Sequence, residues 1–384
     1  MGPPQGRATR DSPSRDSASS SGVGGPASGG PGRRTRIRRS GSADPHPALR
    51  VGRPASGGSE SANPYPADSD LADSDPVYDD FEEPAAGPGT QLVELAAAGI
   101  HHLTRSVAAG RHYSRAGAFP VIPGLNAVAR TADGELVFTS SGRPPYGTFA
   151  ERIASPDAMR FPLPGGAPAE AVAAGINPGM ASWLPLQARL AEAGKLGTIL
   201  VLGVTGLSGF LAAQNARLLG AARVVGAGRS PSGLERAAGA GAQTAALTGD
   251  READAEALAK ALDGDAPGLV LDFVWGPVAE AAFQALGRRG FSEDTADIKY
   301  VQIGALAGTD AAVPSALLRS RKITVSGSGA GSVAAADIKA QIPAYIQLIA
   351  DGSVQVPFRT FPLSEAGPAW TASAEPGPRV VLVR

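Results

Sequence analysis

The chain has 384 residues, of which 43% are hydrophobic, with a formal net charge of -1 and no cysteine. This length and apolar content suffice for one large or two ordinary domains. The near-zero charge makes no electrostatic case for nucleic acid or an anionic membrane, and the lack of cysteine excludes disulfides, thiolate nucleophiles and cysteine-based metal sites. No stretch approaches the roughly 20 apolar residues that span a bilayer, and no secretory signal is evident, so we expect a cytoplasmic protein.

The first segment, residues 1–86, is predicted to be a disordered tail. It is rich in Ser, Gly, Pro, Arg and Asp, and its apolar residues are too sparse to form a core. It carries a basic run at residues 33–39 and an acidic part from Asp68 to Glu83. The basic run is compatible with a nucleic-acid or targeting patch. We favour the simpler interpretation, a solvated extension that folds back on its acidic half.

The next segment is predicted to be small and mostly β. Short apolar pieces occur at Leu92–Leu95, Val121–Gly124 and Glu135–Phe138, and Gly- and Pro-rich turns separate them.

From about Ala169 onward, strands and helices alternate. The predicted strands cover 198–203, 223–226, 269–274, 300–304 and 323–326, and the predicted helices cover 207–219, 250–262, 278–286 and 334–350. This alternation predicts βαβ units and a parallel sheet. A last strand at 379–383 is expected to pair with the β-rich segment.

The most informative motif is Gly203-Val204-Thr205-Gly206-Leu207-Ser208-Gly209, which follows a buried strand and opens an amphipathic helix. In this context Gly203 permits a tight turn, Gly206 lets a pyrophosphate approach the backbone, and Gly209 lets the helix pack closely on the strand. The free N–H groups and partial positive charge of the helix N-terminus favour phosphate. The motif therefore predicts a dinucleotide-binding site.

The end of the second strand decides which dinucleotide is bound. NAD sites place a carboxylate there for the ribose 2′-hydroxyl, whereas this chain has Gly228-Arg229-Ser230. Arg229 can form paired, charge-assisted hydrogen bonds with a 2′-phosphate. The sequence thus favours NADPH, with Arg229 and Ser230 at its adenosine end.

These residues, together with others, carry a family resemblance. Phe119-Pro120-Val121-Ile122-Pro123-Gly124 and Tyr146-Gly147-Thr148-Phe149-Ala150-Glu151 are similar to two segments of the medium-chain dehydrogenase/reductase superfamily, and Gly203 to Ala221 matches its cofactor loop and helix. The turn at 84–89 and the strand that follows it resemble the start of that fold. From about Glu83 to Arg384 the chain resembles the zinc-independent, quinone-oxidoreductase-like branch.

The resemblance implies an α/β protein in which a Rossmann domain with a doubly wound parallel sheet is inserted in a GroES-like β domain. The boundaries would be 1–86 for the tail, 87–172 for the β domain, 173–331 for the Rossmann domain and 332–384 for the return to the β domain. It also implies hydride transfer from NADPH to a quinone or an α,β-unsaturated carbonyl without a metal, and it suggests a homodimer. The family's first β-hairpin should precede Glu83, where the chain is rich in Ser, Asp and Pro. Whether that strand is missing stays open.

The resemblance also assigns residues to the site. Asn177 and Met180 would approach the nicotinamide from the start of a helix, and Ile303, Gly304, Gly327 and Ser328 would border its amide. His101 stands where the family has Asn, and Asn126 stands where it has the acid of a P-G-x-E segment, so the substrate-side contacts differ. Trp275 ends a strand at the edge that binds ligands, although it could equally be a core aromatic. The candidate proton donors are Tyr146 and His102, with Tyr113 a weaker one, but solvent could also complete the reduction.

Two alternatives remain from other classes. A short-chain reductase uses a similar glycine loop, but none of the six tyrosines has a lysine at the Tyr-x-x-x-Lys spacing of that class, and the loop begins only at Gly203. The chain could instead bind NADPH without catalysis, as a redox sensor or as a nucleic-acid binder that uses the basic run of the tail.

Overall fold

The structure is a computed structural model that describes residue 2 and residues 46–51, 76–109, 119–140, 144–288, 293–329 and 331–384. Tyr113 and the basic run at 33–39 lie outside these residues. Residues 43–384 form one compact unit that contains both of the larger sheets described below.

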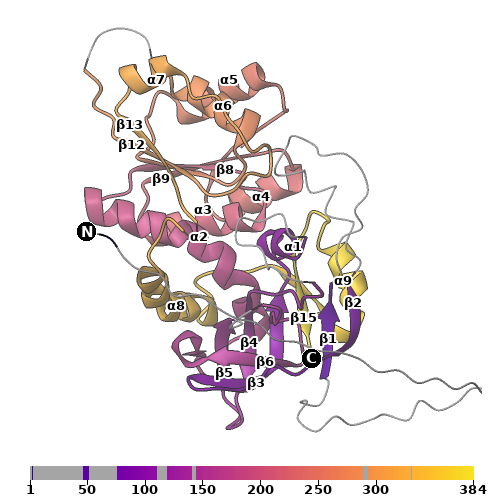
Figure 1. Cartoon of the computed structure of the whole chain (residues 1–384). Coiled ribbons are helices and arrows are strands. Elements are labelled where there is room, and N and C mark those ends of the chain that lie inside the picture. Colours follow the sequence, from indigo (N-terminus) through magenta and orange to yellow (C-terminus); the bar gives the residue numbers. More distant parts are fainter. Residues whose placement is uncertain are drawn as a thin grey trace, which may run out of the picture. The chain divides into compact units, whose positions relative to one another are not determined.

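The first large sheet has seven strands in the order β14-β15-β3-β4-β5-β7, and β6 also pairs with β3. Its strands are β3 (Thr90–Gly99), β4 (Asn126–Arg130), β5 (Leu136–Ser140), β6 (Arg152–Pro156), β7 (Phe161–Pro162), β14 (Phe358–Pro362) and β15 (Arg379–Val383). The prediction that the last strand pairs with the β-rich segment is confirmed, because β15 lies antiparallel to β3, with Val381 opposite Gly99. β15 also pairs in parallel with β14. Figure 1 shows this sheet with strands from both ends of the described chain.

An antiparallel hairpin precedes this sheet. It consists of β1 (His46–Arg50) and β2 (Val77–Phe81), and it docks on the sheet because Leu49 N–H donates to Phe149 O and Val51 N–H donates to Val121 O, both at 2.9 Å. Ala48, Leu49 and Val51 are fully buried in the core of this part. The prediction of a tail up to residue 86 is therefore wrong for residues 46–51 and 76–86, and the first hairpin is present. The signal was weak because residues 52–75 separate the two strands.

The second large sheet is parallel, with six strands in the order β10-β9-β8-β11-β12-β13. These are β8 (Thr198–Leu202), β9 (Arg223–Gly228), β10 (Gln243–Ala246), β11 (Leu269–Asp272), β12 (Ile298–Gln302) and β13 (Ile323–Gly327). The chain runs outward from β8 to β10 and then returns to continue from β11 on the other side of β8. The predicted doubly wound sheet is thus confirmed, and its switch point, where ligands of such sheets bind, lies between β8 and β11.

Helices cover both faces of this parallel sheet (Figure 1). The described helices are α1 (His102–Ala108), α2 (Ala169–Ala193), α3 (Leu207–Leu218), α4 (Pro231–Gly239), α5 (Arg251–Leu262), α6 (Gly276–Leu286), α7 (Ser315–Ser320), α8 (Ala335–Ala350) and α9 (Ala366–Ala372), with 3-10 turns at Asp157–Met159 and Leu363–Glu365. The core against α5, α6 and α7 is separate from the core against α2, α3 and α4. Burial on both faces explains why β8 is a continuous apolar run.

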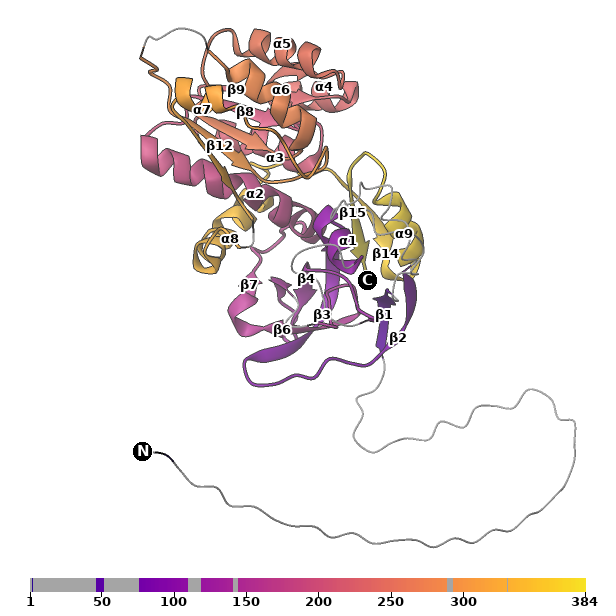
Figure 2. The same ribbon diagram turned by 45° about the horizontal axis from the view of Figure 1, so that its top comes forward.

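Helices α2 and α8 lie side by side although they are far apart in sequence (Figure 2). A buried polar network fixes them to α3. Tyr345 donates to Asn215 Oδ1 at 3.0 Å, and Asn215 Nδ2 donates to the carbonyl of Gly179 at 3.1 Å and to Ser182 Oγ at 2.9 Å. Because buried polar groups are costly unless they are paired, this network specifies how the three helices pack.

Candidate functional site

The glycine motif forms the corner between β8 and α3, and each of its three glycines has a distinct environment. Gly203 has a φ of 87°, and a Cβ there would lie 2.8 Å from Val274 Cγ1, so only glycine makes the turn without strain. A Cβ at Gly209 would lie 2.2 Å from the carbonyl oxygen of Gly203, so glycine is required for the close approach of helix and strand. At Gly206, in contrast, the nearest heavy atom to a Cβ is Gly203 O at 3.7 Å. The corner is therefore open at the glycine that was predicted to face a pyrophosphate.

The N-terminus of α3 lies at this open corner. Gly206 is its N-cap residue and supplies no side-chain cap, so the first N–H groups of the helix keep their capacity to bind an anion. Leu207 is buried, whereas Ser208 is half-buried in the first turn. This arrangement is suited to hold a pyrophosphate against backbone N–H groups.

The side chain of Thr205 packs against the next turn of the sheet. A Cβ at Gly228 would lie 2.5 Å from Thr205 Cγ2, and a Cβ at Gly233 would lie 2.6 Å from Thr205 Cβ. Arg236 Nη2 donates to the carbonyl of Thr205 at 2.8 Å. Thr205 therefore ties the glycine corner to α4, which follows β9.

The adenosine end of the corner lies just after β9. Arg229 is exposed and makes no hydrogen bond or ion pair with the residues that the structure describes. Ser230 is the N-cap of α4, where its Oγ accepts from Gly233 N–H at 3.3 Å and shares a second hydrogen bond, also at 3.3 Å, with Ser232 Oγ. The turn from Gly228 to Ser230 contains no carboxylate that would repel a phosphate.

The end of β11 forms the other side of the switch point. The carboxyl group of Asp272 is fully buried and accepts from the N–H groups of Val274 at 2.9 Å and Trp275 at 2.8 Å, and from the hydroxyl of Tyr300 at 2.6 Å. Burial raises the pKa of Asp272, and the three hydrogen bonds oppose this shift. Trp275 packs edge-on against Phe283 and Tyr300, so its ring belongs to the core on the α6 side.

The remaining predicted cofactor residues lie in three places. Ile303 and Gly304 directly follow β12, where both N–H groups donate to Asp272 O and Gln302 Nε2 donates to Gly304 O. Gly327 and Ser328 end β13 and line a cavity of about 570 Å³ together with α2 and α8. The expectation that Asn177 and Met180 lie at the start of a helix is wrong, because α2 already begins at Ala169 and continues through Pro178. Asn177 is half-buried, and Met180 is 5% exposed in the core shared with α8.

On the substrate side, the two candidate proton donors do not lie together on one element. Tyr146 packs edge-on against Phe81 of the first hairpin, and its pKa is raised by burial and by the carboxylate of Glu82. His102 is exposed at the first position of α1. Asn126 begins β4, and its carbonyl accepts from Thr148 Oγ1 at 3.1 Å. The roles of these residues stay predictions.

His101 is the most unusual of the substrate-side residues. It is 3% exposed, and its ring nitrogens have no hydrogen-bond partner among the described residues other than the backbone of Ala173. Burial lowers the pKa of His101 well below its ordinary value, and the nearby charges of Arg379 and His102 lower it further. The imidazole is therefore neutral at pH 7, and it presents one donor and one acceptor.

Sequence reasoning missed three residues of the site: Asp272, Tyr300 and Arg236. An acidic residue at the end of an apolar strand was a readable signal for Asp272. Its partner Tyr300 lies on the neighbouring strand, and Arg236 lies one turn into α4, so neither had a local signal.

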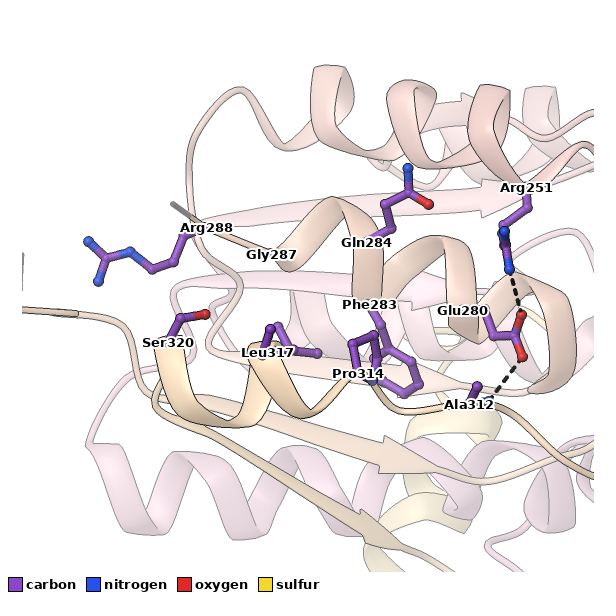
Figure 3. A pocket seen from close by; sticks show the side chains of 11 residues that line it. Arg251, Glu280, Phe283, Gln284, Gly287, Arg288, Ala312, Pro314, Leu317 and Ser320 are labelled. Carbon is purple, nitrogen blue, oxygen red and sulfur yellow. Dashed lines mark hydrogen bonds and ion pairs between the residues drawn. The ribbon is translucent and has the colours of Figure 1, made fainter. Parts of the chain in front are cut away.

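Another pocket, of about 310 Å³, lies between α5, α6 and α7 (Figure 3). It has no predicted site residue in its lining, and the ion pair of Arg251 with Glu280 lies at one end.

In the part of the chain that the structure describes, no group of three or more His, Asp or Glu side chains could hold a metal ion. Within the same residues, no helix is long and apolar enough to cross a membrane.

Comparisons with known proteins agree with this geometry. No protein-family model matches the chain. The probable NADPH-dependent quinone reductase tdiC of Emericella nidulans is 28% identical over 351 residues, which cover 80% of this chain and 96% of that protein. The quinone oxidoreductase of Thermus thermophilus, solved also in complex with NADPH, is 25% identical with a TM-score of 0.67 and covers 88% of this chain and 100% of its own. The Escherichia coli quinone oxidoreductase complexed with NADPH has the same TM-score at 19% identity, and it also covers 88% of this chain and 100% of its own. The resemblance is confirmed as a likeness: over most of its length the chain is similar in sequence to a probable NADPH-dependent quinone reductase, and it has the fold of quinone oxidoreductases of the zinc-independent branch of the medium-chain dehydrogenase/reductase superfamily.

Proposed function

We propose that the protein is an NADPH-dependent oxidoreductase that transfers a hydride to a quinone or an α,β-unsaturated carbonyl. The observation that carries the proposal is the open glycine corner at Gly206 together with the exposed Arg229 that follows β9, with no carboxylate in the turn from Gly228 to Ser230. The three relatives reported above support the same class, since they are named as a quinone reductase or quinone oxidoreductases and two of them were solved with NADPH. They do not favour the non-catalytic alternative.

The chain's own residues would hold NADPH along the C-terminal edge of the parallel sheet. The N–H groups at the start of α3 would bind the pyrophosphate, and Arg229 with the Ser230 hydroxyl would bind the 2′-phosphate. The strand ends at Gly304 and Gly327 would border the nicotinamide half. When bound, NADPH supplies the hydride, so the protein has to orient both reactants and exclude water.

The substrate also needs a proton, because reduction of a quinone or an enone adds a hydride and a proton. Exposed His102 could donate it or relay it from solvent. The raised pKa of Tyr146 makes the phenol a weaker acid than an ordinary tyrosine. Among the substrate-side residues, His101 is buried and neutral, so we propose that it serves as a hydrogen-bonding group and not as a charged one.

A cofactor titration tests the proposal. NADPH and NADH are titrated by their fluorescence into wild type, Arg229→Ala, and the control Arg217→Ala, which changes an exposed arginine at the other end of α3. We expect wild type to prefer NADPH, and Arg229→Ala to weaken NADPH by about tenfold or more while NADH is unaffected. Equal binding of NADH and NADPH by wild type would contradict the cofactor assignment. NADPH consumption with a panel of quinones and enones then separates the two substrate classes.

The homodimer that the resemblance suggests stays a prediction with a plausible surface. β13 is an edge strand of the parallel sheet, and each of its residues is half-buried or exposed. Unpaired edges of this kind are normally covered or blunted. Light scattering after size-exclusion chromatography measures the oligomeric state. Val325→Pro should weaken a dimer that pairs through β13, because the hydrogen bonds of Lys322 and Ser328 to β12 imply that the N–H of Val325 points away from the sheet.

A further inference from the structure

We propose that the buried pair of Asp272 and Tyr300 holds Trp275 in a backbone conformation normally restricted to glycine, and thereby fixes the edge of the sheet against which NADPH binds. Asp272 and Tyr300 are positioning residues in this proposal, because they would act through the backbone of residues 273–276. The proposal rests on the proposed function only for the identity of the ligand.

The starting observation is the backbone of Trp275, which has a φ of 55° and a ψ of -157°. Apart from Asp263, it is the only described residue other than glycine with a positive φ. Side chains clash with the backbone in this region, which is populated almost exclusively by glycine, so the surrounding structure must hold the strain. Such strain collects at functional sites, and Trp275 lies at the carboxyl end of the sheet.

Two sets of contacts hold Trp275. The buried carboxylate of Asp272 accepts the N–H groups of Val274 and Trp275, and the Tyr300 hydroxyl donates to its other oxygen. The indole ring packs edge-on against Phe283 at 5.9 Å and Tyr300 at 6.2 Å between ring centroids. Tyr300 therefore contributes twice, since it orients the carboxylate and supports the ring.

The strained segment lies between two parts of the nucleotide site. Val274 Cγ1 would be 2.8 Å from a Cβ at Gly203, so it is in contact with the glycine corner. The carbonyl of Phe273 would be 2.5 Å from a Cβ at Gly304, and the carbonyl of Val274 accepts from Ala307 N–H at 2.7 Å. A shift of residues 273–275 would therefore displace both the glycine corner and the loop that follows β12.

That loop is also fixed at its far end. Glu280 of α6 accepts from the N–H of Ala312 at 3.0 Å and pairs with Arg251, as the dashed lines in Figure 3 show. With both ends fixed, the loop has little freedom to compensate for a change at Trp275. The position of the loop should therefore follow the Asp272–Tyr300 pair.

The first test compares two tyrosine variants that each lose one phenol–carboxylate hydrogen bond. Tyr300→Phe removes the bond to Asp272 and keeps the ring, and Tyr78→Phe removes the bond from Tyr78 to Glu151, at 3.0 Å, in the first hairpin. Both should lower the melting temperature. Only Tyr300→Phe should also raise the NADPH dissociation constant, by about fivefold or more, which corresponds to about 1 kcal/mol. Equal dissociation constants in the two variants would overturn the proposal.

The second test asks whether the pair acts through the strain at Trp275. In Trp275→Gly the backbone conformation costs little, so addition of Tyr300→Phe should raise the dissociation constant by less than about twofold. The same fivefold loss in both backgrounds would show that Tyr300 acts by another route. If Trp275→Gly does not fold, the comparison of Tyr300→Phe with Tyr78→Phe still decides.

A third measurement needs no nucleotide. Amide hydrogen exchange of Val274 and Trp275, whose N–H groups Asp272 accepts, should be faster by about tenfold in Tyr300→Phe than in wild type, and unchanged in Tyr78→Phe. Unchanged exchange in Tyr300→Phe refutes the positioning role. Failure of wild type to bind NADPH, with the expected exchange result, would instead refute the proposed function.

Discussion

Substitution of Gly206 by alanine should weaken cofactor binding strongly and leave the fold almost intact. Its φ of -80° and ψ of 165° are accessible to alanine, and the nearest atom to the new Cβ would be Gly203 O at 3.7 Å. Alanine is a poorer N-cap residue than glycine, so we expect a loss of stability of about 1 kcal/mol or less. The methyl group would nevertheless project from the N-cap of α3, beside the N–H groups that would bind a phosphate.

The expected loss of affinity follows from the hydrogen bonds at stake. A hydrogen bond to a charged group contributes about 1.5–3 kcal/mol, so displacement of the pyrophosphate from even one N–H should weaken NADPH by about 10- to 100-fold. The assay is a fluorescence titration with NADPH, with thermal denaturation of the same samples. Gly209→Ala is the contrasting variant, because its Cβ would lie 2.2 Å from Gly203 O and the backbone has no room to yield. It should lose stability as well as binding, whereas a folded Gly206→Ala that binds NADPH within about twofold of wild type would refute the reasoning.

Two further predictions concern pH and packing. Burial lowers the pKa of His101 in the folded state, so below the ordinary pKa of 6.5 the unfolded chain binds one more proton than the folded chain. The free energy of unfolding should therefore fall as the pH drops from about 6.5 towards 5, by up to about 1.4 kcal/mol per pH unit. Urea unfolding should show a flatter pH dependence for His101→Asn, and an unchanged slope would contradict the buried neutral imidazole. Gly179→Ala would place a Cβ 2.1 Å from the Tyr345 hydroxyl, so it should lower the free energy of unfolding by about 2 kcal/mol or more. In the control Gly165→Ala the new Cβ has no atom within 4 Å, so the free energy of unfolding should change by less than about 0.5 kcal/mol. Equal effects of the two substitutions in urea unfolding would show that α2 packs on α8 more loosely than described.

The sequence predicted the parallel sheet and its glycine corner because both depend on local patterns. A strand buried on both faces has to be largely apolar, as Ile199–Leu202 is within β8, and an amphipathic helix beginning at Leu207 follows it. Each glycine of the corner was assigned its role from spacing alone, and the environments of Gly203, Gly206 and Gly209 differ in the way those roles require. The pairing of the last strand also followed from a simple rule, since a strand needs a neighbour.

The prediction of a tail up to residue 86 failed because β1 and β2 are short and have little signal of their own. Each is stabilised by partners distant in the chain: β1 by β2 across residues 52–75 and by the backbone near Val121 and Phe149. Strand formation depends on such non-local partners, which composition does not reveal. Likewise, the expectation from the family resemblance that Asn177 and Met180 lie at the start of a helix failed, because α2 begins at Ala169 and runs through Pro178.

The sequence by itself determined the fold class and the glycine corner between β8 and α3, because strand periodicity, helix periodicity and the glycine spacing are properties of neighbouring residues. Only the tertiary structure showed the glycine-like backbone of Trp275 and the carboxylate–phenol pair of Asp272 and Tyr300 beneath it. The physical reason is that these residues lie on adjacent strands joined through α6, so their contact exists only once the sheet has assembled.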